Sequence, residues 1–144
     1  MNEFEVSDFD GDGAGDNSDQ DDDNDGVADT IDSFPYNFSE WLDTDGDGIG
    51  NNSDDDDDGD SISDEIEMSN GTNPLLADTD DDGVSDEFDF APLNDLEQFD
   101  TDGDGIGNNA DDDDDNDGVK DVDDDLPLDA SESVDSDGDG VGNN

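Results

Sequence analysis

Aspartates recur along this chain in the pattern Asp-x-Asp-x-Asp, and a glycine follows the third of them in nearly every copy. Carboxylates at positions 1, 3 and 5 can surround one side of a hard cation, and a glycine at position 6 permits the sharp turn that follows. A carbonyl at position 7, a side chain at position 9 and an acid at position 12 would complete a shell of oxygens. The chain has no histidine and no cysteine, which removes the usual ligands of zinc, copper and iron–sulfur sites. The pattern therefore predicts 12-residue loops that bind calcium.

Seven complete loops share one register, and an eighth begins but has no position 12. In loops 1 to 4 the predicted side-chain ligands are Asp8, Asp10, Asp12, Asp16 and Asp19; Asp21, Asp23, Asp25, Asp29 and Asp32; Asp43, Asp45, Asp47, Asn51 and Asp54; Asp56, Asp58, Asp60, Asp64 and Glu67. In loops 5 to 8 they are Asp78, Asp80, Asp82, Asp86 and Asp89; Asp100, Asp102, Asp104, Asn108 and Asp111; Asp113, Asp115, Asp117, Asp121 and Asp124; Asp135, Asp137, Asp139 and Asn143. The predicted carbonyl ligands at position 7 are those of Val27, Ile49, Ile62, Val84, Ile106, Val119 and Val141. A disordered acidic tract would also contain scattered matches, but seven in one register favour calcium loops.

One repeating unit explains the spacing: a leading loop, one linking residue, a trailing loop and a ten-residue spacer. The loop pairs are residues 8–32, 43–67 and 100–124, a single loop occupies residues 78–89, and residues 135–144 open a further leading loop. The spacers are residues 33–42, 68–77, 90–99 and 125–134. Leading loops are thus loops 1, 3, 6 and 8, and trailing loops are loops 2, 4 and 7. We predict one continuous array over residues 1–144, and we expect it to be an excerpt of a longer array because loop 8 lacks its closing acid.

The charge of the chain means that any compact state requires cations. The sequence contains 53 acids and one base, for a formal net charge of −52, and only 25% of its residues are hydrophobic. Such a composition is typical of disordered chains. One calcium ion in each complete loop would change the net charge from −52 to −38, and two in each would change it to −24, so we expect at least seven ions and more ions than loops. Nucleic acid would be repelled, and no stretch is apolar enough to span a membrane.

Other calcium modules fit the sequence less well. EF-hand and dockerin loops carry an apolar residue at position 8, whereas here the apolar residue is at position 7 and position 8 of the leading loops is glycine. No spacer could carry a helix of three turns, and each spacer contains a proline. The glycine-rich nonapeptide of calcium β-rolls is also absent.

The paired loops resemble thrombospondin type 3 repeats, as residues 100–121, DTDGDGIGNNADDDDDNDGVKD, and residues 43–64 illustrate. The resemblance covers nearly the whole chain. It implies a mostly irregular backbone, with little helix or strand, wound around a string of calcium ions. It also implies that the Asp, Asn and Glu residues given above are the ligands, and that a loop often holds two ions that share carboxylates.

The chain departs from the animal members of that family in its lack of cysteines. Those members place a cysteine before the closing acid of the leading loop and another just before the spacer proline. The corresponding residues here are Ser18, Ser53 and Ala110 in the loops, and Phe34, Ala91 and Leu126 in the spacers. Cysteine-free versions resemble repeats of bacterial surface and secreted proteins, in which ions and spacer packing must hold the fold.

The spacers carry most of the large apolar residues. These are Phe34, Phe38, Trp41, Leu42, Leu75, Leu76, Phe90, Leu93, Leu96, Phe99, Leu126 and Leu128. We expect each spacer to bury them in a small core against the position-7 residues of adjacent loops. The alternative is that the aromatic-rich spacer Phe34–Leu42 contacts another chain.

These features predict a structural protein and not an enzyme. General acid–base catalysis needs a carboxyl group that is protonated near neutral pH, whereas carboxylates that share calcium have lowered pKa values. We expect an extracellular calcium-binding segment, a calcium-rigidified stalk or spacer of a larger cell-surface, secreted or adhesin-like bacterial protein, with flanking repeats as its neighbours. The alternative is a self-assembling calcium-dependent filament or matrix subunit, whose partners are other copies of itself. A mineral-nucleating or halophilic surface role is a third possibility.

Overall fold

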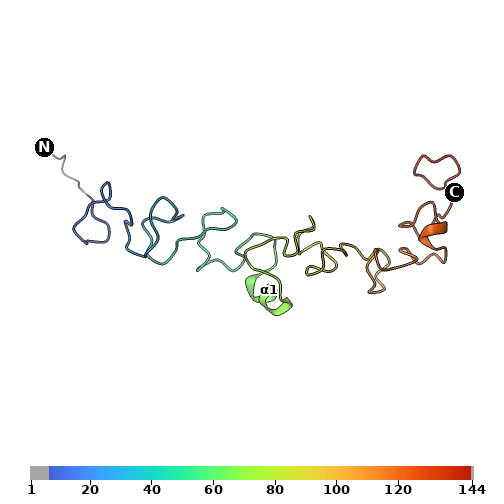
Figure 1. The fold of residues 1–144 in the computed structure, drawn as a ribbon, viewed down its shortest axis with the longest axis horizontal. Coiled ribbons are helices and arrows are strands. Elements are labelled where there is room, and N and C mark those ends of the chain that lie inside the picture. The colour runs from blue at the N-terminus through green and yellow to red at the C-terminus, as the bar shows by residue number, and fades with distance from the viewer. Residues whose placement is uncertain (1–6, 144) are drawn as a thin grey trace. The chain divides into compact units, whose positions relative to one another are not determined.

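The backbone is almost entirely irregular in this computed structural model, which describes residues 7–143 (Figure 1). The described residues contain one α-helix, α1 (Asp64–Asn70), one 3-10 helix, η1 (Asp121–Asp123), and no strand. The prediction of a mostly irregular chain with little helix or strand is confirmed. Within residues 7–143, no helix has both the length and the apolar character needed to cross a membrane.

Helix α1 begins inside loop 4 and extends into the following spacer. Its first turn carries Asp64, Glu65 and Glu67, whose charges suit the positive end of the helix dipole. Gly71 ends it in the left-handed region, with φ 90°, and the Gly71 N–H donates to the Glu67 carbonyl at 2.7 Å. The helix has seven residues, about two turns. It is therefore compatible with the prediction that no spacer carries a helix of three turns.

All eight loops are closed by the same two hydrogen bonds, both made by the residue at position 9. Its N–H donates to the carbonyl of the residue before the loop, at 2.9–3.2 Å. Its side-chain oxygen accepts the N–H of position 2, at 2.8–3.1 Å. In loop 3 these bonds join Asn51 to Leu42 and to Thr44. The register expected from the sequence therefore recurs as one local geometry.

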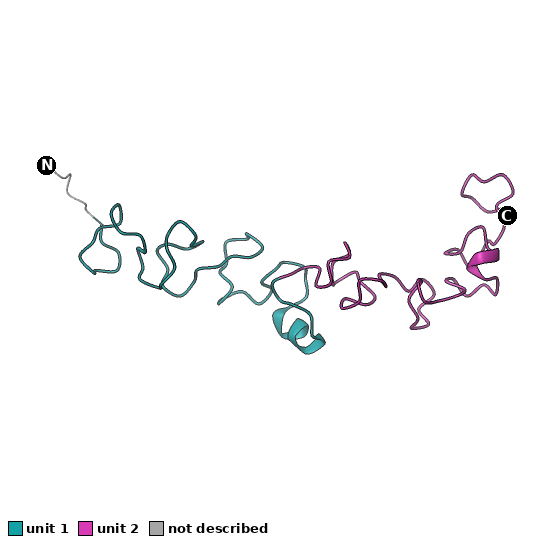
Figure 2. Cartoon of the chain, viewed as in Figure 1, with its two compact units in different colours: residues 1–75 teal, residues 76–144 magenta. Residues whose placement is uncertain are grey.

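The chain divides into two compact units, residues 1–75 and 76–144 (Figure 2). Among the described residues of each, the buried side chains are acids, and no apolar side chain is buried. In the first unit Asp22 and Asp23 are each 5% exposed, and in the second Asp86 is also 5% exposed. Carboxylates thus occupy the interior that hydrocarbon fills in an ordinary domain.

The prediction that the spacers form small apolar cores is wrong. Phe38 is 68% exposed and Leu96 is 65% exposed. Three spacers are instead tied across their own ends by a backbone hydrogen bond, as from the Ser33 N–H to the Trp41 carbonyl at 3.1 Å. A spacer of ten residues that is closed into a turn is too short to cover its own apolar side chains. The ring contact between Phe9 and Tyr36, with centroids 5.4 Å apart, joins a spacer to a loop without burying either residue.

Candidate metal sites

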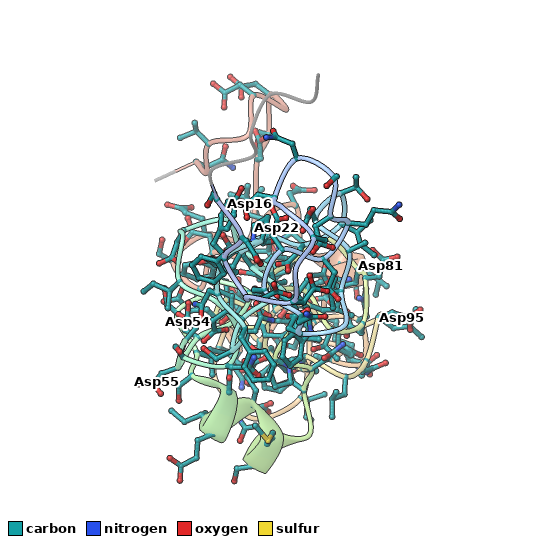
Figure 3. The ribbon with its side chains drawn as sticks, turned by 90° about the vertical axis from the view of Figure 1, so that its left-hand side faces the viewer. Asp16, Asp22, Asp54, Asp55, Asp81 and Asp95 are labelled. Atoms are coloured by element: carbon teal, nitrogen blue, oxygen red, sulfur yellow. The ribbon has the colours of Figure 1, made fainter. Side chains whose placement is uncertain are left out.

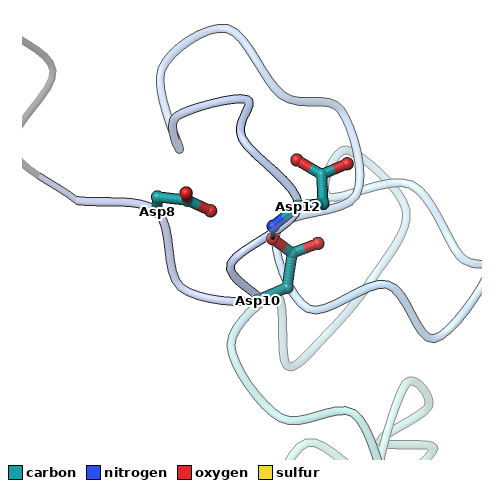
Figure 4. A group of neighbouring side chains, drawn as sticks. All are labelled: Asp8, Asp10 and Asp12. Atoms are coloured by element: carbon teal, nitrogen blue, oxygen red, sulfur yellow. Dashed lines mark hydrogen bonds between the residues drawn. The ribbon is translucent and has the colours of Figure 1, made fainter.

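The aspartates at positions 1, 3 and 5 converge in each loop type. Among residues 7–143, eight groups of three or more acids each bring one oxygen per residue within 4.8 Å of the others. They include Asp8, Asp10 and Asp12; Asp21, Asp23 and Asp25; Asp43, Asp45 and Asp47; Asp56, Asp58 and Asp60; and Asp78, Asp80 and Asp82. Figure 4 shows the first of these groups, in which the three carboxylates follow one turn of the backbone.

Within a group, the aspartates at positions 3 and 5 use Oδ1 to shape the loop, whereas the position-1 aspartate uses both oxygens in loops 5, 6 and 8. The position-5 carboxylate accepts the N–H of position 7 through Oδ1 in all eight loops, at 2.6–3.0 Å. The position-3 carboxylate accepts the N–H of position 5 in the same way in loops 1 to 7, at 2.8–3.3 Å. These bonds use Oδ1 and leave Oδ2 for a ligand in most loops; in loops 1 and 6, Asp10 Oδ2 and Asp102 Oδ2 accept the side-chain amides of Asn24 and Asn116.

In the trailing loops and in loop 5, several of these second oxygens are buried and have no hydrogen-bond donor. In loop 2 they are Asp21 Oδ1, Asp23 Oδ2, Asp25 Oδ2 and Asp32 Oδ2. In loop 7 they are Asp113 Oδ1, Asp115 Oδ2 and Asp124 Oδ2, and in loop 5 they are Asp80 Oδ2, Asp82 Oδ2 and Asp89 Oδ2. A buried anionic oxygen without a donor is strongly unfavourable unless a cation compensates it. The set combines positions 1, 3, 5 and 12, which are the positions that the loop pattern assigns to the ion.

The pKa values of these buried carboxyl groups also indicate that they need a cation. Burial, reinforced by neighbouring carboxylates, raises the pKa values of Asp23, Asp80, Asp89 and Asp115. The protein has one base, Lys120, and its ammonium pairs with the exposed Asp112 at 2.5 Å, outside the groups. The counter-charge for the buried carboxylates must therefore come from solution.

The leading loops are more open. None of their described carboxylate oxygens belongs to the buried set without donors. At position 9, three of them have asparagine, whose amide donates to the hydroxyl at position 2, as from Asn51 to Thr44 at 2.7 Å. Because the Asn51 oxygen accepts the Thr44 N–H, this predicted ligand serves in the structure to close the loop. Its role toward an ion stays a prediction.

A second acidic cluster lies between the two loops of each pair, and its central residue was not among the ligands predicted from the sequence. This residue is the aspartate at position 2 of the trailing loop: Asp22, Asp57 or Asp114. The carboxylates of Asp29, Asp16 and Asp19 surround Asp22 and, after burial, are the largest causes that raise its pKa. Figure 3 labels Asp16 and Asp22, one from each loop of the pair. Asp22 Oδ1 is buried without a donor, although the Tyr36 hydroxyl donates to the carboxylate.

The other two pairs repeat this cluster. Asp57 is 9% exposed, and burial followed by the charges of Asp64 and Asp54 raises its pKa. Burial and then the charges of Asp121 and Asp111 raise the pKa of Asp114. Asp57 Oδ1 and Asp114 Oδ1 are also buried without donors. In all other loops position 2 is Phe, Thr or Ser, so the acid at position 2 of trailing loops was the signal that could have revealed this cluster.

No protein-family model matches this chain, and no curated protein is significantly similar to it. The resemblance to thrombospondin type 3 repeats therefore rests on the sequence motifs alone. The structure brings together the acids predicted at positions 1, 3 and 5. The acid at position 12 interacts with them in loops 2, 5 and 7, whereas Asp19, Asp54 and Asp111, at position 12 of leading loops, belong to the second acidic cluster.

Proposed function

We propose that this chain is an extracellular calcium-binding repeat array in which bound ions take the place of a hydrophobic core. One observation carries the proposal: buried carboxylate oxygens without hydrogen-bond donors gather at positions 1, 3, 5 and 12 of loop 2, at positions 3, 5 and 12 of loop 5, and at positions 1, 3 and 12 of loop 7. Calcium is the favoured ion because it accepts six to eight oxygen ligands in flexible geometry, including carboxylates and backbone carbonyls. Magnesium is smaller and demands a stricter octahedron.

The proposed stoichiometry is at least one ion in each of the seven complete loops. The clusters around Asp22, Asp57 and Asp114 favour one more ion between the loops of each pair. Seven loop ions and three ions between loops would offset 20 of the 52 net negative charges and leave −32. The proposal therefore expects more ions than complete loops.

The structural role proposed is that of a stalk or spacer in a larger cell-surface or secreted protein of a bacterium, with no catalytic activity. The irregular backbone supports it, because such a chain becomes rigid only when ions are bound. Loops of extracellular calcium modules bind with dissociation constants of about 10⁻⁴–10⁻³ M. A segment with these affinities is ordered outside the cell, where calcium is abundant, and needs no further partner than the flanking repeats.

The direct test is the number of ions bound. Native mass spectrometry and isothermal titration calorimetry of the full chain should show more than seven calcium ions, with magnesium at equal concentration binding more weakly. A count below seven would overturn the proposal. Equal binding of both ions would contradict the choice of calcium.

A second candidate is a self-assembling filament or matrix subunit, which the exposed spacers favour. Phe90, Phe99 and Leu128 line an open cleft together with Phe88, and Phe88 is 70% exposed. Apolar surface of this kind could join copies once calcium has lowered their mutual repulsion. Light scattering across a calcium titration separates the candidates: particle size stays that of one chain for a stalk and grows for a filament subunit.

A further inference from the structure

A three-residue pattern that ion binding does not explain recurs before and within the leading loops. Glutamate stands at the eighth residue of the spacer, glycine follows ten residues later at loop position 8, and asparagine follows at loop position 10. The sets are Glu40, Gly50 and Asn52; Glu97, Gly107 and Asn109; Glu132, Gly142 and Asn144; and Glu5, Gly15 and Asn17. Glu5 and Asn144 lie outside the described residues. Loop 5 is a single loop, and the pattern is absent there: the corresponding residues are Leu75 in the preceding spacer and Ser85 and Glu87 in the loop.

The structure shows that these residues contact one another. Glu40 is 4% exposed, and its two carboxylate oxygens are both used. Oε2 accepts the Asn52 N–H at 3.0 Å, and Oε1 accepts the Ser53 hydroxyl. The Asn52 side chain donates back to the Ser39 carbonyl at 2.7 Å, so spacer and loop are joined in both directions. A Cβ on Gly50 would lie 2.6 Å from Glu40 Cδ, which explains the glycine.

The same contacts recur in the later repeats. The Asn109 N–H donates to Glu97 Oε2 at 3.1 Å, and the Asn109 amide donates to the Leu96 carbonyl. A Cβ on Gly107 would lie 2.8 Å from Glu97 Cδ, and one on Gly142 would lie 2.6 Å from Glu132 Cδ. Three spacers thus place a glutamate against the same glycine of the next loop.

The segment held by Glu40 carries two predicted ligands. It is a single helical turn in which the Ser53 and Asp54 N–H groups donate to the Gly50 carbonyl at 2.8 and 2.9 Å. Asn51 and Asp54, at positions 9 and 12, lie on this turn. Glu40 accepts an N–H that the turn itself leaves without a partner, as an acid does at the start of a helix. Because both oxygens of Glu40 have donors, it is not itself poised to bind an ion.

We infer that Glu40 and Glu97, and by repetition Glu132, are positioning residues that lock the ligand-bearing turn of each leading loop onto the preceding spacer. The inference rests on the proposed calcium binding and adds to it a residue type that the loop motif does not contain. Glu40 joins the spacer to Ser53, the residue that stands where the animal repeats have a loop cysteine. The lock thereby preorganises loops 3 and 6, which lack the buried oxygens of the trailing loops.

The test compares Glu40→Ala and Glu40→Gln in the full chain, with Glu65→Ala as the control that removes an exposed glutamate from α1. Terbium luminescence sensitised by Trp41, the only tryptophan and two residues from loop 3, reports the local ion, and calcium competition gives its affinity. Removing a residue that orients a ligand commonly costs about tenfold or more in metal affinity, so Glu40→Ala should lose about tenfold. Glu40→Gln keeps the shape and an acceptor and should bind nearly as well as the natural chain.

The outcomes separate the two claims. If the natural chain binds no calcium, the proposed function fails and the lock fails with it. If it binds but Glu40→Ala matches Glu65→Ala, only the lock is overturned. A Glu40→Gln loss as large as that of Glu40→Ala would make Glu40 a direct ligand and also overturn the lock. Finally, Gly50→Ala should lower the calcium affinity of the natural chain but should lower that of Glu40→Ala little further, because both substitutions disrupt the same contact. Fully additive losses of affinity would contradict the role inferred for Glu40.

Discussion

Aspartate suits these loops because its short side chain reaches the neighbouring backbone and the loop interior at the same time. In loop 2 the Asp25 Oδ1 accepts the Val27 N–H at 2.7 Å while Asp25 Oδ2 is buried without a donor. Glutamate has one more rotatable bond, and Glu67, the one glutamate at a predicted ligand position, is held by the rigid α1. The predominance of aspartate is thus a consequence of this double role.

At the residue scale, the cluster between paired loops predicts a countable effect. Replacing Asp57→Asn removes one charge from a site that Asp54 and Asp64 share, so we expect one fewer ion at saturating calcium in native mass spectra. The matched control is Asp55→Asn, which removes an exposed carboxylate two residues away and should leave the count unchanged. Identical counts for both variants would contradict an ion at this place.

A second prediction concerns the only complete loop without glycine at position 6. The sequence predicts that Ser61 adopts positive φ, and the structure confirms it at 83°. Left-handed backbone costs a non-glycine residue about 1–2 kcal/mol. Ser61→Gly should therefore raise the calcium affinity of loop 4 or the melting temperature, whereas Ser63→Gly, at φ −76°, should give no gain.

The reverse change should be damaging in loop 6. Gly105 has φ 95°, and a β-branched valine is strongly disfavoured there. We expect Gly105→Val to abolish binding in that loop in a terbium or calcium titration. If Ser61→Gly and Gly105→Val are both neutral, the register of the loops is wrong.

At the scale of elements, the spacing of the aspartates predicted where one loop geometry recurs, because each position-9 N–H donates to the residue before its loop. The use of position 9 to close the loop was not predicted from the sequence, because a side chain there can serve an ion or the loop, and the bonds of Asn51 show the second use. Asp57 was overlooked because it stands in a run of five aspartates. Phe38 is exposed because its ten-residue spacer is too short to cover it, and the hydrophobicity of the spacer gave no indication of this.

Helix α1 connects an element to a site, because it carries Asp64 and Glu67 of loop 4. Gly71 ends it with φ 90°, so Gly71→Ala should cost about 1 kcal/mol through the loss of this cap. Far-UV circular dichroism and thermal melting in calcium should show a smaller helical signal and a lower midpoint. Ser69→Ala, an exposed change within the helix, should be neutral or slightly stabilising. A loss with Ser69→Ala as large as that with Gly71→Ala would contradict the capping role.

At the scale of the whole molecule, calcium should order the chain with little gain of helix or strand. The expected marker is hydrogen exchange at the position-9 amides, such as that of Asn51, which donate across each loop. These amides should be protected in calcium and exposed in chelator, while circular dichroism changes little. A large gain of helix, or exchange that calcium does not slow, would contradict the proposed folding.

The acidic interior has a thermal consequence. Heat-capacity changes on unfolding come mainly from newly hydrated apolar surface, about 12–15 cal/mol/K per residue in ordinary domains. No apolar side chain is buried among the described residues, so the calcium-loaded chain should unfold with a much smaller value in differential scanning calorimetry. Its stability would then change almost linearly with temperature, without the weakening in the cold that a large heat-capacity change causes. Removal of calcium by a chelator should therefore denature such a protein more readily than moderate cooling or warming.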